Sequence, residues 1–441
     1  MLKAVKFGGS SLANATQVLK VKDIILSDSS RSAVVVSAPG KRFSNDNKIT
    51  DLLYLCYAHV KYGVDYTSVL ELIKSRYQEI VDGLQISLDV ESEFKLIDEN
   101  IKKGFGEDYL VSRGEYLSAK IMAKVLDFDF VDSYGNVFFN YDKTVDTKKT
   151  YEALKLAFNS SKGKIVVPGF FGTMPDGSLA LMSRGGSDIT GALLSAALGA
   201  DVYENWTDVP GILMADPSIV NNPRPIPLIT YDELRELTYM GAKVLHEAAV
   251  FPVRQAGIPL NIKDTNNPDH PGTMIAEKFE LDKEDEFYIT GIAGKKGYTV
   301  IDVKTQDLAK NVAVYRNVLK VLENRSVFVE QILSGVDAFS LIVRGDFVKP
   351  IIYTLVAEIE EICGAGNVRV TEGLSMIACV SRMMVFKPGI SGKIFSALGQ
   401  NNVNIRMISQ GAEELNIIIG VDDSSLEKAI QVLYESFTKK D

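Results

Sequence analysis

Short runs of β-branched residues alternate with helical patterns through the first part of the chain. The runs are typical of short buried strands, and they lie at 2–7, 33–37, 164–168 and 201–206. Apolar residues at helical spacing separate them, for example at 14–26, 112–126, 188–197 and 231–245. Such alternation needs crossover connections, which place helices on both faces of a mostly parallel sheet. We therefore predict a three-layer α/β/α domain.

The pattern changes after a charged run at 281–287, which is typical of a linker or of a solvated helix end. From there the order becomes strand, helix, strand, strand, and four of its residues recur 76 residues later. The pairs are Leu322 and Leu398, Val327 and Val403, Ile332 and Ile408, and Gly335 and Gly411. Unless the match is a coincidence between apolar segments, it indicates two copies of one βαββ unit.

Composition narrows the classes of partner and compartment. The 441 residues suggest two to four domains at about 100–200 residues each. The net charge is −9, and no long Lys or Arg run offsets it, which argues against nucleic acid or an anionic membrane surface as a partner. The N-terminus has no apolar signal-peptide core, and no apolar run is long enough to span a membrane, so we expect a cytoplasmic protein. Three cysteines without a C-x-x-C pair argue against structural zinc or a disulfide framework.

A pair of glycines follows the first predicted strand, in the segment KFGGSS at 6–11. Glycines let the backbone approach a ligand closely, and a helix that begins near Ser11 would direct its positive N-terminal end at an anion. Lys6 would point a full cation at the same place. This arrangement predicts a phosphate site, although a tight turn without a ligand would have the same pattern.

Two further turns carry charged residues at predicted helix starts. In SRGGSD at 183–188, Arg184 could clamp a carboxylate or phosphate through two parallel hydrogen bonds, with Asp188 beside it. In SRGE at 112–115, Glu115 could bind an ammonium group. The alternatives are that Ser187 or Asp188 only caps a helix, and that Glu115 only complements a helix dipole.

Two loops downstream contain other candidate ligand residues. Asp208, in WTDVPG at 206–211, could accept from a ribose or an adenine, although a plain turn explains Pro210 and Gly211 equally well. Lys243, in MGAKVLH at 240–246, could reach a phosphate or could be a surface lysine. His246 is better explained as a structural histidine than as a catalyst.

Together these motifs resemble the amino acid kinase family and, within it, the aspartate kinases. The similar strings are KFGGSS, SRGEYLSA, SRGGSD, WTDVPGI and GAKVLH, in the order and spacing of that family. The resemblance covers essentially the whole chain, and SRGGSD followed by WTDV is the specific part. It implies transfer of the γ-phosphoryl group of ATP, with Mg²⁺, to the β-carboxylate of L-aspartate. It also implies a cytoplasmic role in the synthesis of lysine, threonine and methionine, without a fused homoserine dehydrogenase.

The resemblance also implies a role for each matching residue. Lys6 and Asp188 would be the catalytic pair, with Asp188 organising Lys6. The aspartate site would contain Ser37, Thr50, Glu115, Arg184 and Ser187. The ATP site would contain Lys6, Phe7, Gly8, Gly9, Ser10, Thr207, Asp208, Leu213, Asp216, Ser218, Lys243 and Val244. No side chain is assigned as a metal ligand.

Three of these residues depart from the family pattern. Ser10 replaces a threonine and keeps its hydroxyl group. Leu213 stands where an aromatic residue is usual, which puts adenine stacking there in doubt. Ser218 stands where an arginine is usual, which removes one expected nucleotide-binding cation.

The βαββ units resemble paired ACT domains, which bind free amino acids. We predict a kinase domain at 1–285 and a regulatory region at 286–441, with one unit at about 297–372 and another at about 373–441. The first unit would be inserted in the second, whose opening strand would lie near 287–295. Glu330, Ser334 and Asp337 match the effector region, or they are ordinary solvated turn residues. Lysine, or else threonine, would be the feedback inhibitor, and the chain would form a homodimer through these domains, or a tetramer.

Phosphoryl transfer to a carboxylate is a reaction that the candidate residues could catalyse. The side chain of free aspartate, with an ordinary pKa of about 3.9, is already ionised at neutral pH, so the reaction needs no general base. The remaining difficulty is repulsion between anions, which lysines and helix N-termini relieve. Two other functions stay open at this stage: a related kinase acting on glutamate, acetylglutamate, carbamate or UMP, and a non-catalytic amino acid sensor.

Overall fold

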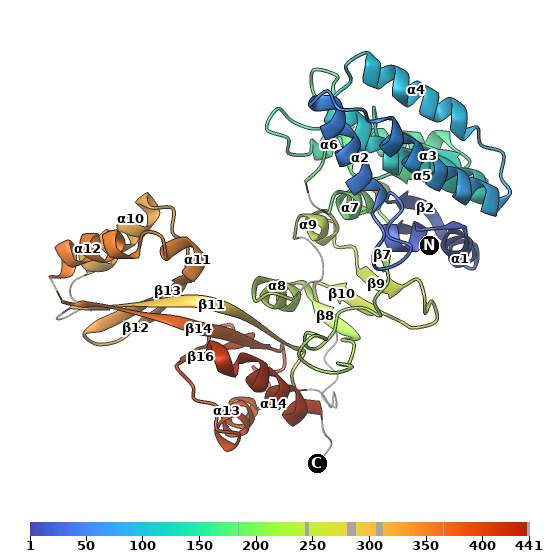
Figure 1. The fold of residues 1–441 in the computed structure, drawn as a ribbon. Coiled ribbons are helices and arrows are strands. Elements are labelled where there is room, and N and C mark those ends of the chain that lie inside the picture. The colour runs from blue at the N-terminus through green and yellow to red at the C-terminus, as the bar shows by residue number, and fades with distance from the viewer. Residues whose placement is uncertain (184, 243–246, 280–287, 306–311, 365, 439–441) are drawn as a thin grey trace. The chain divides into compact units, whose positions relative to one another are not determined.

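The computed structural model describes the 441-residue chain except for 184, 243–246, 280–287, 306–311, 365 and 439–441 (Figure 1). It divides into two compact units. The first comprises Met1–Ile212, Pro225–Tyr231 and Val244–Glu280. The second comprises Leu213–Arg224, Asp232–Lys243 and Leu281–Asp441. Two segments from inside the first 285 residues therefore cluster with the C-terminal part of the chain.

A twisted sheet forms the centre of the first unit. Among the described residues it has eight strands in the order β3-β4-β2-β1-β7-β9-β10-β8, and only β9 and β10 pair antiparallel. The strands are β1 (Lys3–Phe7), β2 (Arg31–Val36), β3 (Asp129–Phe130), β4 (Ile165–Pro168), β7 (Val202–Thr207), β8 (Leu228–Thr230), β9 (Leu260–Asp264) and β10 (Thr273–Ala276). A separate hairpin pairs β5 (Phe171–Thr173) with β6 (Leu179–Leu181).

Helices cover both faces of this sheet, because alternate side chains of each strand point to opposite faces. Val5 and Phe7 of β1 pack in a core with α1 to α5, whereas Ala4 packs in a core with α6 and α7. The predicted three-layer α/β/α fold with a mostly parallel sheet is confirmed. The helices are η1 (Gly9–Leu12, a 3-10 turn), α1 (Ala15–Leu26), α2 (Ile49–Lys61), α3 (Thr67–Leu84), α4 (Val90–Lys102), α5 (Glu107–Leu126), α6 (Thr147–Ser160), α7 (Gly186–Leu198) and α9 (Glu247–Gln255).

The second unit contains an antiparallel sheet in the order β12-β13-β11-β14-β16-β15. Its strands are β11 (Gly291–Lys304), β12 (Val329–Ser334), β13 (Ala338–Arg344), β14 (Val368–Val380), β15 (Met407–Ser409) and β16 (Asn416–Asp422). Its helices are α8 (Tyr231–Tyr239), α10 (Val312–Asn324), α11 (Gly345–Val348), α12 (Ile352–Cys363), α13 (Ile390–Gln400), the 3-10 turn η3 (Asp423–Ser425) and α14 (Leu426–Thr438). Helices α10 to α12 gather at one end of this sheet and α13 and α14 at the other (Figure 1).

The long central strands serve both ends of the sheet. The first part of β11 pairs with the end of β14, and after a bulge its second part pairs with the beginning of β14 and with β13. The 76-residue repeat has a structural counterpart, since Val327 N–H donates to Leu322 O at 2.9 Å and Val403 N–H donates to Leu398 O at 3.0 Å. The preceding residues, Ser326 and Asn402, have nearly equal positive φ angles of 55° and 56°.

The structure corrects three predicted helix boundaries. The α-helix after the glycine pair begins at Ala15, where Asn14 caps it by accepting from Gln17 N–H, and only a 3-10 turn follows Gly8 directly. Glu115 lies inside α5 rather than at its start, because the helix begins eight residues earlier at Glu107. The described part of α8 ends at Tyr239 instead of continuing to 245, and 243–246 lie outside the described residues. None of the described helices combines the length and apolar character that crossing a bilayer requires.

Candidate active site

The glycine pair after β1 meets the loop after β2. Gly40 N–H donates to Gly9 O at 2.7 Å. A Cβ atom added to Gly9 would lie 2.6 Å from Ala38 O, and one added to Gly40 would lie 2.7 Å from Gly9 C. Only glycine lets the two backbones approach this closely. Because Gly8 N–H also donates to Trp206 O at 3.0 Å, the carboxyl ends of β1, β2 and β7 meet at one edge of the sheet, where α/β proteins bind ligands.

A partly buried ion pair lies at this edge. Lys6 Nζ is 2.6 Å from Asp188 Oδ1, and Asn205 Nδ2 donates to the same oxygen at 2.9 Å. Gly185, with φ of 77°, is the N-cap of α7, and no side chain caps this helix end. The alternative that Asp188 only caps a helix is therefore wrong, since its carboxylate contacts Lys6 and Asn205 instead.

A second carboxyl group, that of Glu115, is buried at the same edge. Ser187 Oγ donates to its Oε1 at 2.7 Å, while its Oε2 is buried without a hydrogen bond within the described ranges. A Cβ atom on Gly169 would lie 2.6 Å from Oε2, so a larger residue there would block this oxygen. Burial raises the pKa of Glu115 to about 8, against the opposing effects of the Ser187 hydroxyl and the Lys6 charge. The carboxyl group is therefore mostly protonated at neutral pH in the absence of a ligand. A cation that binds beside it would lower its pKa and favour the ionised carboxylate.

The other predicted aspartate-site residues flank this region. Ser37 follows β2 directly, and its N–H donates to Phe7 O at 3.1 Å. Thr50 is in the first turn of α2. Ile49, the residue before Thr50, donates its N–H to Pro39 O at 3.0 Å, which ties α2 to the loop after β2. Arg184 lies outside the described residues.

The predicted ATP-site residues are distributed over both units. Phe7, Gly8, Gly9, Ser10, Thr207 and Asp208 belong to the first unit. Thr207 Oγ1 donates to Asp208 Oδ1 at 3.2 Å in the loop after β7. Leu213, Asp216 and Ser218 belong to the second unit, where Ser218 Oγ donates to Asp216 Oδ1 at 2.6 Å. Lys243 and Val244 lie outside the described residues.

The three predicted effector residues lie on or next to β12 in the second unit. The Glu330 carboxylate accepts from the Tyr239 hydroxyl, and Ser334 shares a hydrogen bond of 2.6 Å with the Tyr315 hydroxyl. Asp337 O accepts from Thr305 N–H at 2.9 Å. Glu330 and Ser334 thus lie on the edge strand β12, and Asp337 lies in the turn that follows it.

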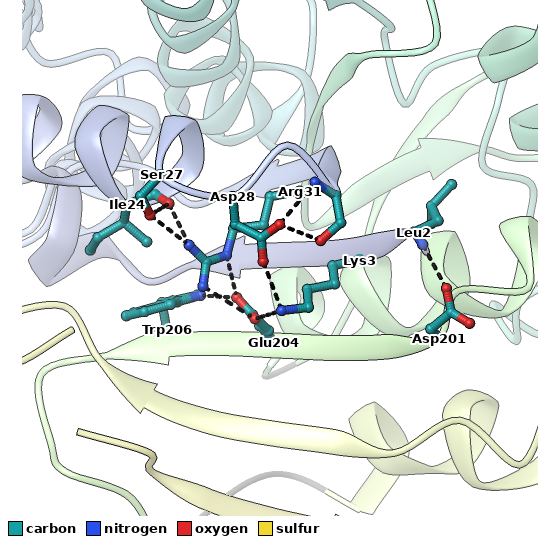
Figure 2. Close-up of polar contacts among 10 residues, drawn as sticks. Leu2, Lys3, Ile24, Ser27, Asp28, Arg31, Asp201, Glu204 and Trp206 are labelled. Atoms are coloured by element: carbon teal, nitrogen blue, oxygen red, sulfur yellow. Dashed lines mark hydrogen bonds and ion pairs between the residues drawn. The ribbon is translucent and has the colours of Figure 1, made fainter. Parts of the chain in front are cut away.

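A charged network lies on the face of the sheet opposite the side chain of Lys6, because Glu204 and Trp206 alternate with Asn205 along β7. Figure 2 shows the contacts of this network. Glu204, whose side chain is only 4% exposed, lies 2.8 Å from Arg31 Nε and 3.3 Å from Lys3 Nζ. Trp206 Nε1 donates to Glu204 at 2.9 Å. Lys3 also contacts Asp28 at 2.8 Å, and this hydrogen bond holds the pKa of Asp28 well below its usual range. The network joins β1, β2 and β7, and so holds in register the strands whose carboxyl ends form the site.

Sequence reasoning missed three residues at this edge. Asn205 lies between Glu204 and Trp206 in a strand whose residues are mostly buried, and two adjacent polar residues in such a strand are the signal that could have identified it. Gly169 follows β4 directly, and Gly40 follows β2 in the segment SAPG. A lone glycine after a strand is a common turn signal, so these two could not be distinguished from plain turns.

Within the ranges that the structure describes, no three His, Cys, Asp or Glu side chains lie close enough to hold a metal ion.

Comparison with known proteins identifies the class. Residues 1–264 match the model of the amino acid kinase family, and residues 377–437 match an ACT domain. The first match covers more than half of the chain, so the chain belongs to the amino acid kinase family.

Full-length relatives narrow the class further. Aspartokinase 3 of Bacillus subtilis (strain 168) is 35% identical over 99% of this chain and 98% of its own length. The crystal structure of Clostridium acetobutylicum aspartate kinase is 46% identical over 99% of this chain and all of that one, with a TM-score of 0.88. E. coli aspartokinase III is 25% identical, with TM-scores of 0.73 for its complex with aspartate and ADP (R-state) and 0.71 for its complex with lysine and aspartate (T-state). Within its family the chain therefore belongs to the aspartokinases.

Proposed function

We propose that this chain transfers the γ-phosphoryl group of ATP to the β-carboxylate of L-aspartate, which gives 4-phospho-L-aspartate and ADP. The observation that carries the proposal is the partly buried Lys6–Asp188 pair beside the glycine turn, at the edge where the three parallel strands end. E. coli aspartokinase III, with the same fold, is known in complex with aspartate and ADP. In biosynthesis this reaction would be the first step toward lysine, threonine and methionine.

The residues at the sheet edge would act by position and charge. The acceptor carboxylate is ionised without help, so no side chain has to remove a proton. Lys6 would bind the transferring phosphoryl group while Asp188 holds its ammonium in place, and Gly8, Gly9 and Ser10 would let the backbone approach the phosphates. Mg²⁺ bound to the nucleotide would neutralise phosphate charge.

Glu115 would recognise the ammonium group of aspartate. Its free Oε2 is buried and faces the space that Gly169 leaves, while Ser187 fixes Oε1. An ammonium ion beside Oε2 would favour the ionised carboxylate. Ser37 and Thr50 would contact the same substrate, and Arg184 would bind its α-carboxylate.

The regulatory region would inhibit the kinase through linkage. An effector that binds one arrangement of the ACT units better shifts the protein toward that arrangement, by as much as its differential affinity. We propose lysine, or else threonine, as this effector, bound near Glu330, Ser334 and Asp337. The T-state complex of E. coli aspartokinase III with lysine supports this choice. We also propose a catalytic domain at 1–285, regulatory units at about 297–372 and 373–441 with an opening strand near 287–295, and a cytoplasmic homodimer or tetramer.

Aspartate-dependent release of ADP tests the proposal, with hydroxylamine used to trap the acyl phosphate. We expect turnover with aspartate but not with glutamate or acetylglutamate, and inhibition by lysine or threonine. A protein that binds lysine without any turnover would be the sensor instead, and turnover with glutamate or acetylglutamate would assign the chain to another kinase of the family. The Lys6→Ala variant is the control for contaminating kinases.

A further inference from the structure

Asn205 lies directly beside Lys6, the proposed catalytic lysine, on an adjacent parallel strand. Lys6 of β1 and Asn205 of β7 are register partners. Both side chains leave the same face of the sheet, toward α7, which carries Asp188. Asn205 is only 2% exposed, so its amide group must form its hydrogen bonds inside the protein.

One oxygen of Asp188 accepts from both neighbours. Lys6 Nζ lies 2.6 Å from Oδ1 and Asn205 Nδ2 lies 2.9 Å from it. The same strand also holds the backbone of Asp188, because the Tyr203 hydroxyl donates to its carbonyl oxygen at 3.1 Å. Gly191 allows this contact, since a Cβ atom there would collide with the Tyr203 ring. Two residues of β7 therefore fix the first turn of α7: Tyr203 binds the backbone of Asp188, and Asn205 binds its side chain.

We propose that Asn205 is a positioning residue for phosphoryl transfer. Its amide donates to Asp188 and prevents rotation of that carboxylate, which holds Lys6 at the glycine turn. Because the amide is neutral, it does not compete with Lys6 for the negative charge of Asp188. A cation at position 205 would neutralise Asp188, and an apolar residue would leave the shared oxygen with one donor fewer. This role rests on the proposed kinase function and adds a residue to its machinery.

Two substitutions separate positioning from packing. Asn205→Leu has a similar volume but removes the donor, and we expect kcat to fall about 10- to 100-fold, the rate equivalent of one hydrogen bond to a charged group. The KM for aspartate should change little, because Asn205 contacts the Lys6–Asp188 pair rather than Glu115. A loss of packing alone would lower the stability of the protein, but it would not lower kcat selectively while leaving KM unchanged.

Asn205→Asp keeps the shape and makes the donor depend on pH. When protonated, the new carboxyl group can donate to Asp188 as the amide does. When ionised, it repels Asp188, so the two carboxylates share a proton and lose it at a raised pKa. We expect this variant to approach wild-type kcat at low pH and to lose activity as the pH rises.

The pH dependence must be read as a ratio to the wild type. The other titratable groups facing this position in the described residues are Lys6, Glu115 and Tyr203. Burial raises the pKa of Tyr203 well above its ordinary value, so this residue stays neutral over the assay range. Glu115 titrates in both proteins, so the ratio is taken from kcat at saturating aspartate, where the protonation of Glu115 does not limit binding.

The control is Asn261→Leu, the same change at a half-buried asparagine on the neighbouring strand β9, for which we expect wild-type kcat. Absence of aspartate-dependent turnover in the wild type would overturn the proposed function itself. With an active wild type, an unchanged kcat in Asn205→Leu, or a constant activity ratio for Asn205→Asp between pH 6 and pH 9, would overturn the positioning role. If Asn205→Leu does not fold, the ratio for Asn205→Asp decides alone.

Discussion

Replacing Glu115 with glutamine should stabilise the ligand-free protein while it damages substrate binding. Burial raises the pKa of Glu115 to about 8 from an ordinary value of 4.5. A carboxyl group with a raised pKa in the folded state contributes its full stability below the unfolded value, and this stability is lost as the pH rises toward the folded value. At pH 7 the ionisable group therefore costs about 3 kcal/mol, at about 1.4 kcal/mol per pH unit.

Glutamine removes this cost because it does not ionise. We expect Glu115→Gln to unfold at a higher temperature than the wild type at pH 7, by up to roughly 10 °C for a unit of this size. The difference should be small at pH 5, vanish near pH 4, grow up to about pH 8 and stay constant above it. Differential scanning calorimetry without aspartate, over this pH range, measures it.

The same substitution should weaken aspartate binding at neutral pH, because an amide cannot pair with an ammonium ion. In the wild type the KM for aspartate should fall as the pH rises from 6 to 8, by about tenfold per unit while Glu115 is mostly protonated. Glu99→Gln, an exposed position on α4, is the matched control and should leave both quantities unchanged. The reasoning fails if Glu115→Gln unfolds at the wild-type temperature at every pH.

Three other predictions concern the site and its support. Lys6→Ala should lower kcat about 10²- to 10³-fold in steady-state assays, as loss of a preorganised charge does, and near-normal turnover would exclude its catalytic role. Glu204→Gln should lower the free energy of unfolding by about 2 kcal/mol in urea titrations, because Arg31 and Lys3 lose their shared buried partner; an unchanged midpoint would contradict the network in Figure 2. Gly9→Ala should destabilise the protein by about 1–3 kcal/mol and reduce ATP affinity in calorimetric titrations, since its Cβ atom would lie 2.6 Å from Ala38 O. Wild-type ATP binding in that variant would show that the loop can move aside.

Much of the architecture follows from local pattern. The alternation of short apolar strands with helices identified β1, β2, β4 and β7 and their parallel sheet, because each crossover needs a helix between neighbouring strands. The pairing of Leu322 with Leu398 marked the repeat, since both residues form the same backbone hydrogen bond at the end of a helix. Lys6 could be singled out because a lysine before two glycines at a strand end combines a cation with an accessible backbone.

The tertiary structure alone decided how these groups combine. Whether Asp188 caps its helix or binds Lys6 depends on the register of β1 and the position of α7, which no local pattern specifies. The sequence predicts Glu115 at a helix start, but its place inside α5 buries it and raises its pKa. A polar residue in a buried strand marks Asn205 in the sequence, but only the pairing of β7 with β1 places it beside Lys6. Residues far apart in the chain acquire their charge state and their partners from burial, and burial exists only once the helices have packed on the sheet.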